Sequence, residues 1–227
     1  MDSIVFDQFY RDYDSWYHTK IGAFVDTIET ETAFRLLQPQ NGEKILDLGC
    51  GTGNFSLKLS KMGCQVTGVD ISRNMLNLAR EKASRLSSSA RFLEMNGYQL
   101  QFEDQSFDSV LSMAAFEFIS QPEIVFKELW RVIKPGGFIV IGTIQKGGAW
   151  AQLYSSDLCK GTAYEQAQFK EKEELIALSP QNLTAEDECL FIPPGLPEEE
   201  YNLQTEKMMR KKEKIGGFLC VAFQKTV

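Results

Sequence analysis

Short apolar runs alternate with longer segments of helical period from Lys44 onward. Runs of strand length followed by helical segments are typical of βαβ units that build a parallel sheet. The pattern therefore predicts an α/β domain. Its strands are expected at Lys44–Leu48, Gln65–Val69, Arg91–Glu94, Phe107–Ser112 and Phe138–Gly142.

The segments between these runs carry the start and stop signals of helices. Asn54–Lys61 has apolar residues at helical spacing and is followed by Gly63, which favours a helix end. Ser72 is the expected N-cap of the next helix. Pro122 begins a further amphipathic helix, which the segment Lys134–Gly137 ends.

The two flanks of this pattern differ from its centre. An aromatic-rich stretch and an amphipathic helix precede the first strand and predict a cap over one sheet edge, at Phe6–Tyr17 and Ala23–Leu37. After the fifth strand we expect partly helical chain at Lys146–Leu178, a strand at Glu186–Ile192 and a charged helix at Glu198–Lys212. A last strand is expected at Phe218–Gln224, at the far edge of the sheet. We predict one domain over residues 1–227, with a helical cap at 1–40 and substrate-side insertions at 145–215.

Composition narrows the classes of function. At 227 residues and 43% hydrophobic content the chain suits one domain, and its formal net charge of -7 disfavours a nucleic acid partner. Five scattered cysteines without a C-x-x-C pair and a single histidine, His18, predict neither a disulfide framework nor a metal site. The sequence shows no signal-peptide pattern and no apolar run near the about 18 residues of a membrane span, so we expect a cytoplasmic protein.

A glycine-rich turn follows the first strand. Ile45–Gly53 places glycines at alternate positions, which lets the backbone approach a ligand closely. Asp47, at the end of the strand, would repel a pyrophosphate and attract an ammonium or sulfonium group. Asp70 closes the second strand, where a carboxylate accepts hydrogen bonds from ribose hydroxyls. The pattern favours a positively charged nucleoside.

These residues resemble the class I S-adenosylmethionine-dependent methyltransferases, in particular the ubiquinone/menaquinone-biosynthesis or type 11 branch. The resemblance extends from Tyr13 to Gly142, and four blocks carry it: Ile45–Gly53, Val66–Ser72, Phe107–Ser112 and Glu128–Gly137. It implies a Rossmann-like, doubly wound sheet of seven strands, mostly parallel with an antiparallel last strand, and an N-terminal helical lid. It also implies S-adenosylmethionine as cofactor, S-adenosylhomocysteine as product and a small-molecule methyl acceptor.

The resemblance also assigns residues to the cofactor. It implies that the glycine backbone and Asp47 bind the methionine part, that Asp70 binds the ribose, and that Ile71 and Met75 pack on the adenine. Asn96 stands where the family usually has an acid, and its carbonyl oxygen can still accept a bond from the adenine amino group. The full expected set is Tyr13, Trp16, Asp47, Gly49, Cys50, Gly51, Gly53, Asp70, Ile71, Met75, Asn96, Gly97, Ser112 and Met113.

The acceptor side offers fewer candidates. Glu117 follows the fourth strand and is the candidate base or substrate hydrogen-bond acceptor, although an acid in a first helical turn is also commonplace. The aromatic stretch with Tyr13 and Trp16 is either a lid over the cofactor or a packing stripe. Trp150 and Tyr154 either wall the acceptor pocket or pack in the core.

Two other functions compete with methyl transfer. One is a regulatory or partner-binding module that keeps the cofactor site without turnover. The other is a nicotinamide-dependent oxidoreductase. The spacing G-x-G-x-G in place of G-x-G-x-x-G, and Asp47 beside it, count against the oxidoreductase.

Overall fold

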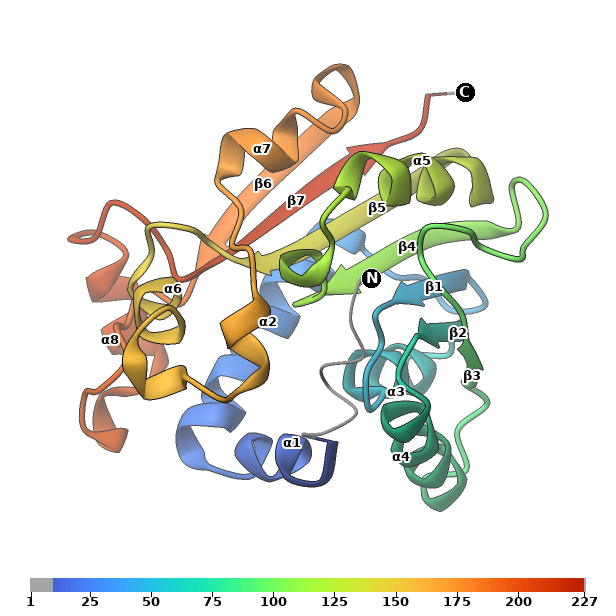
Figure 1. Cartoon of the computed structure of the whole chain (residues 1–227). Helices are drawn as coiled ribbons and strands as arrows, with labels where there is room; N and C mark the ends of the chain where they lie inside the picture. The colour runs from blue at the N-terminus through green and yellow to red at the C-terminus, as the bar shows by residue number, and fades with distance from the viewer. Residues whose placement is uncertain (1–9, 227) are drawn as a thin grey trace.

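A computed structural model describes residues 10–226, so the first part of the predicted aromatic stretch, including Phe6, lies outside the described residues. The chain forms a seven-stranded sheet in the order β3-β2-β1-β4-β5-β7-β6, with helices on both faces (Figure 1). The strands are β1 Lys44–Leu48, β2 Gln65–Asp70, β3 Arg91–Glu94, β4 Phe107–Met113, β5 Ile133–Ile144, β6 Leu183–Cys189 and β7 Phe218–Gln224.

The strand directions confirm the predicted fold class. Strands β1 to β5 pair in parallel with their neighbours, and β7 runs antiparallel to both β5 and β6. From β1 the chain builds outward through β2 and β3 on one side and through β4 and β5 on the other. This reversal of strand order makes β1 and β4 the switch point, where open α/β sheets bind ligands beyond the carboxyl ends of the strands.

The helices connect the strands and flank the sheet. The α-helices are α1 Tyr10–Tyr17, α2 Lys20–Leu37, α3 Asn54–Lys61, α4 Arg73–Arg85, α5 Pro122–Val132, α6 Ala149–Tyr154, α7 Lys172–Ile176 and α8 Leu203–Met209. Short 3₁₀ turns lie at η2 Phe116–Phe118, η3 Asp157–Cys159, η4 Ala163–Gln166, η5 Pro180–Asn182 and η6 Glu198–Glu200. No helix of residues 10–226 is long and apolar enough to span a membrane.

Capping side chains explain where helices begin. The predicted N-cap Ser72 is confirmed, because its Oγ accepts the Met75 N–H at 3.2 Å. Thr19 Oγ1 accepts the Gly22 N–H at 3.0 Å, so α2 begins at Lys20, three residues before the predicted start.

Several other predicted boundaries were wrong, and β2, β4 and β5 extend beyond their predicted ends. The charged helix expected at Glu198–Lys212 is a 3₁₀ turn followed by α8, which begins after Asn202 because the Asn202 side chain accepts the N–H groups of Gln204 and Thr205. The strand expected at Glu186–Ile192 begins at Leu183 and ends at Cys189, before Leu190 turns the backbone to a positive φ of 59°. Helix α5 ends at Val132, directly before the Lys134–Gly137 segment predicted to end it. That segment already belongs to β5, which begins at Ile133 and not at the predicted Phe138, and the register with β4 shifts there.

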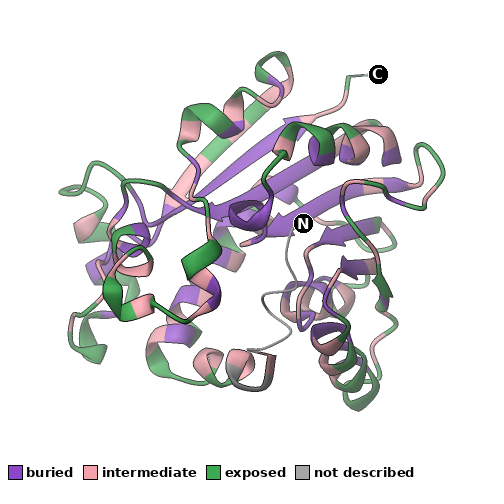
Figure 2. Cartoon of the chain, in the orientation of Figure 1, coloured by how far each residue is buried: buried purple, intermediate pink, exposed green. Residues whose placement is uncertain are grey.

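An apolar layer lies between the sheet and the helices on each of its two faces. One face of the sheet packs on α2 and α3 through residues such as Ile28, Leu59 and Val140, and the other packs on α5 and α7 through residues such as Leu129 and Leu175. The central strands are therefore buried on both faces (Figure 2). Buried central strands fix the positions of the loops at their carboxyl ends, where the candidate site lies.

Candidate active site

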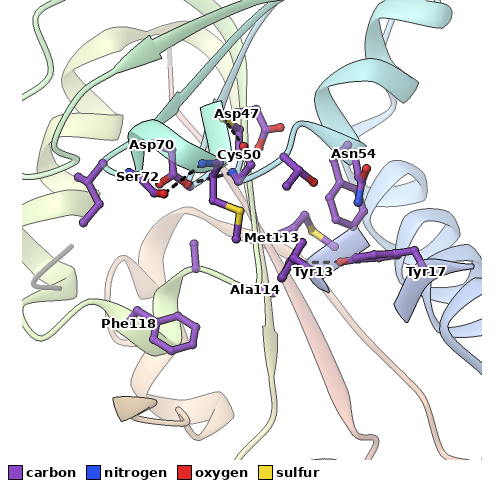
Figure 3. Close-up of a pocket in the computed structure, with 17 residues that line it drawn as sticks. Tyr13, Tyr17, Asp47, Cys50, Asn54, Asp70, Ser72, Met113, Ala114 and Phe118 are labelled. Carbon is purple, nitrogen blue, oxygen red and sulfur yellow. Dashed lines mark hydrogen bonds between the residues drawn. The ribbon is translucent and has the colours of Figure 1, made fainter. Parts of the chain in front are cut away.

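A cavity with an empty volume of about 730 Å³ lies beyond the carboxyl ends of β1, β2 and β4. The glycine turn, the end of β2, the start of α4 and the end of β4 form its walls, and α1 contributes Tyr13 and Tyr17 (Figure 3). Its size is in the range of pockets that bind cofactors and other small molecules.

The glycine turn brings bare backbone to this cavity. Gly49, Gly51 and Gly53 have φ values of 71°, 51° and 79°, in the left-handed region that favours glycine. A Cβ built on Gly51 would meet no atom within 4 Å, so this residue faces open space. The turn is tied to β2, because the N–H groups of Gly49 and Cys50 both donate to Val69 O, at 2.8 and 3.1 Å.

Asp70 is held on the wall by backbone donors. Its Oδ2 accepts the Gly51 N–H at 2.9 Å and its Oδ1 accepts the Ser72 N–H at 2.8 Å. Burial raises the pKa of this carboxyl, and the backbone hydrogen bonds oppose that rise. Each oxygen keeps a further lone pair with which it can accept a ligand hydroxyl.

Asp47 lies deeper in the same wall, where only 1% of it is exposed. Its Oδ2 accepts the hydroxyl of Ser56 at 2.6 Å. Burial raises its pKa to about 7, and the charge of Asp70 adds to the effect. Within residues 10–226 neither carboxylate forms an ion pair, so this part of the chain supplies no partner cation to the two buried acids.

Apolar side chains form the remaining wall. Ile71, Met75, Met113 and Phe118 all line the cavity. Cys50 also lines it, and burial raises the pKa of its thiol well above the usual value, so the thiol stays protonated. This agrees with a packing role for Cys50 rather than a nucleophilic one.

A polar network ties α1 to the glycine turn. The Asp14 carboxylate accepts the Thr52 hydroxyl at 2.7 Å, the Asn54 amide at 3.3 Å and the Lys82 ammonium at 2.9 Å. Tyr13 and Tyr17 on the same helix lie against the cavity, with their hydroxyl oxygens 3.3 Å apart. No local sequence signal predicts this network, because its members are up to 68 residues apart.

The structure brings nine of the fourteen predicted cofactor residues to the cavity wall: Tyr13, Asp47, Gly49, Cys50, Gly51, Asp70, Ile71, Met75 and Met113. Lining residues that were not predicted are Tyr17, Thr52, Asn54, Phe55, Ser72, Ala114, Ala115 and Phe118. Several of these directly follow a predicted residue along the chain, so a longer reading of each loop would have included them.

The other predicted residues lie outside the wall. Gly53 packs against Phe92, and the Ser112 hydroxyl donates to Leu48 O at 2.9 Å. Asn96 is exposed, and its Oδ1 accepts the Tyr98 N–H at 3.1 Å. The remaining two are Gly97, which is buried beside Leu48, and Trp16, which lines a neighbouring cavity.

Glu117 lies in η2 and is fully buried. Its Oε1 accepts the Ile144 N–H at 2.8 Å, and its Oε2 has no hydrogen-bond partner in the described part of the chain. Burial raises its pKa to about 7. Glu117 is not on the wall of either cavity, so this structure does not place it in contact with a substrate.

A second cavity, of about 410 Å³ of empty volume, adjoins the first. Tyr13, Tyr17 and Ala114 line both cavities and separate them. Trp150 and Tyr154 line the second cavity, and the Trp150 indole N–H donates to Ile192 O at 2.9 Å. A ligand in the first cavity and a molecule in the second would therefore meet at α1 and the end of β4.

Comparisons with known proteins point to one family. Residues 46–141 match the family model of the methyltransferase domain. An uncharacterized protein of Mycobacterium tuberculosis is 31% identical over 188 residues, which cover 81% of this chain and 62% of that protein. A demethylmenaquinone methyltransferase of Clavibacter sepedonicus is 34% identical over 139 residues, covering 61% of this chain and 56% of that enzyme. The chain thus matches about three fifths of the length of these relatives.

Solved structures share the fold along nearly the whole chain. A SAM-dependent methyltransferase from Thermotoga maritima superposes with a TM-score of 0.74 at 23% identity and covers 98% of this chain and 99% of that one. A Haemonchus contortus phosphoethanolamine N-methyltransferase, solved with S-adenosylhomocysteine, gives a TM-score of 0.70 at 18% identity and covers 97% of this chain and 58% of that one.

Proposed function

Since the chain belongs to the class I S-adenosylmethionine-dependent methyltransferase family, in its menaquinone and type 11 branch, we propose that it transfers a methyl group from S-adenosylmethionine to a small-molecule acceptor. The observation that carries this proposal is the pair of buried carboxylates, Asp47 and Asp70, beside the glycine turn, neither of which forms an ion pair with a side chain of residues 10–226. The net charge of -7 favours a small molecule over a nucleic acid as acceptor.

The cavity residues fit this cofactor. An ammonium group is the natural partner of Asp47, because a buried carboxylate without a cation is costly and a bound cation relieves that cost. Asp70, fixed by Gly51 and Ser72, is positioned to accept two vicinal hydroxyls of a ribose. Ile71 and Met75 offer the apolar surface that a purine ring requires. When bound, the cofactor supplies a methyl group that the positive charge on sulfur has already activated.

The same charges disfavour a nicotinamide dinucleotide. A pyrophosphate at the glycine turn would lie close to Asp47 and Asp70, and two like charges in a buried site repel strongly. The second cavity favours turnover over the alternative of a cofactor-binding module without a reaction, because it provides space for a further molecule at the junction.

The chain contributes mainly position and the exclusion of water. Tyr13 and Tyr17 cover the junction of the two cavities, and the Asp14 network fixes their helix on the glycine turn. Alignment of two bound molecules and a dry site supply much of the rate in a displacement with a good leaving group. A base on the wall is not required for such a reaction.

Calorimetric titration with S-adenosylmethionine tests the proposal. Asp70→Asn should weaken binding about 10- to 150-fold, which corresponds to the loss of about 1.5–3 kcal/mol of charge-assisted hydrogen bonds. The matched control is Glu94→Gln, an exposed acid that ends β3, the strand next to β2. Glu94→Gln should leave binding unchanged. Equal affinity of Asp70→Asn and the wild type, or tight binding of NAD in place of S-adenosylmethionine, would overturn the proposal.

A further inference from the structure

Aromatic side chains surround the second cavity. They come from α1, from α6 and from η4, parts of the chain that are far apart in sequence. The rings of Tyr154 and Tyr164 stack with centroids 4.0 Å apart, and Trp16 and Tyr17 meet edge to face at 5.2 Å. The six that matter here are Tyr13, Trp16, Tyr17, Trp150, Tyr154 and Tyr164. A wall of this kind binds apolar groups and, through the electron-rich ring faces, organic cations.

Glu29 is the single carboxylate among the described residues that line this cavity. It lies on α2 one turn after Val25, which also lines the cavity, so the buried side of the helix points the carboxylate at the space. Only 8% of Glu29 is exposed, and its carboxylate has no hydrogen-bond partner within residues 10–226.

No cation of the described residues 10–226 forms an ion pair with Glu29. Lys58 is close enough for its charge to act on Glu29, but its ammonium already binds Asp26 and the Thr30 hydroxyl. Burial is the main cause that raises the pKa of Glu29 well above its usual value, and the acids Asp26 and Glu117 add to the rise. A buried acid without an ion-pair partner among residues 10–226 is unfavourable for stability, which indicates a ligand as its partner.

We propose that the second cavity is the acceptor site and that the acceptor is an amine, which enters as an ammonium cation bound by the Glu29 carboxylate inside the aromatic wall. The ammonium passes one proton to that carboxylate, and the freed nitrogen lone pair then forms the new bond to the methyl carbon as the bond from that carbon to sulfur breaks and S-adenosylhomocysteine leaves. This inference rests on the proposed function, because it makes the bound amine the molecule that receives the methyl group. The shared walls Tyr13, Tyr17 and Ala114 place the amine next to the cofactor cavity.

A neutral acceptor would fit this cavity less well. A quinone or an uncharged phenol stacks on the rings, but it leaves the buried Glu29 without a positive partner. An anionic acceptor would be repelled by Glu29 and by Glu117 behind it. An ammonium group on an apolar body satisfies both the acid and the rings.

A pair of probes with matched shape tests the inference by binding alone. The protein is first saturated with S-adenosylhomocysteine and is then titrated calorimetrically with 2-phenylethylamine or with 2-phenylethanol, which replaces the ammonium group with a hydroxyl. The wild type should bind the amine at least about tenfold more tightly than the alcohol, as expected for a charge-assisted hydrogen bond. Glu29→Gln should bind both probes with equal affinity.

The control variant is Glu31→Gln, which removes an exposed acid from the same helix and should keep the preference for the amine. Glu29 does not line the cofactor cavity, so Glu29→Gln should bind S-adenosylhomocysteine as the wild type does, which also shows that the variant is folded. If S-adenosylhomocysteine binds but the amine shows no advantage, or if Glu29→Gln keeps that advantage, the inference is wrong and the proposed function stands. If S-adenosylhomocysteine fails to bind the wild type, the proposed function itself fails.

Discussion

Asp47→Asn should stabilise the ligand-free protein at neutral pH while it weakens cofactor binding. Asp47 is 1% exposed, and burial raises its pKa from 3.8 to about 7. An amide of the same shape carries no charge, so it avoids the desolvation cost, and its carbonyl oxygen can still accept the Ser56 hydroxyl. The variant thus separates the effect of the Asp47 charge on the free energy of folding from its effect on cofactor affinity.

The pKa shift sets the sign and the size of the effect. Because the folded state holds the Asp47 proton more tightly than the unfolded state, the contribution to stability is fully present below pH 3.8 and is lost as the pH rises to about 7. A shift of about three units at about 1.4 kcal/mol each amounts to about 4 kcal/mol at most. At about 2–4 °C per kcal/mol for a domain of this size, the advantage of Asp47→Asn in Tm should grow by on the order of 10 °C from pH 4 to pH 8.

Thermal unfolding without ligand, followed from pH 8 to about pH 3, measures the effect. Asp108→Asn is a control of opposite sign. Burial acts to raise the pKa of Asp108, but hydrogen bonds from Lys134 and from the Lys44 N–H hold it below the usual value. Asp108→Asn should therefore lower Tm at pH 8, and the loss should shrink as the pH falls below 3.8. A Tm of Asp47→Asn at or below the wild-type value at pH 8, or a difference that does not change with pH, would refute the reasoning.

Gly53→Ala should lower Tm by several degrees, because the φ of Gly53 is +79° and the new Cβ would lie 2.7 Å from the Phe92 ring. Gly136 has a φ of +82° but no atom within 4 Å of the new Cβ, so Gly136→Ala should cost only the backbone strain of about 1–2 kcal/mol. Lys82→Met should weaken S-adenosylhomocysteine binding about tenfold and speed amide hydrogen exchange in α1, because it removes the ammonium bound to Asp14; unchanged exchange in α1 would contradict this. Arg131→Lys should lower the unfolding free energy in urea by about 2 kcal/mol, since a lysine cannot hold the two loop carbonyls and the carboxylate that the guanidinium binds.

The central strands were predictable because they are buried on both faces and read as apolar runs between turn residues. The bounds of β1, β3 and β7 are those predicted. The starts of helices were harder to predict. Thr19 and Asn202 each begin a helix through side-chain hydrogen bonds to backbone N–H groups, and these bonds are not visible in the periodic pattern of apolar residues.

The candidate site was also predictable only in part. Asp47 and Asp70 were found because each ends a strand, and parallel strand ends meet at one edge of the sheet. Asp14 and Lys82 meet only in the folded chain, so the sequence offered no signal for their contact. Glu29 had a faint one, an acid in the apolar stripe of an amphipathic helix between Val25 and Ala33.

The position of β7 between β5 and β6 has a consequence for biosynthesis. Strand β6 leaves the ribosome before β7, yet β7 is its pairing partner in the sheet, so β5 and β6 both present open edges until Phe218–Gln224 has been made. The open edge of β5 is apolar, and edges of this kind recruit other chains, so a nascent polypeptide stalled before Phe218 is expected to require a chaperone.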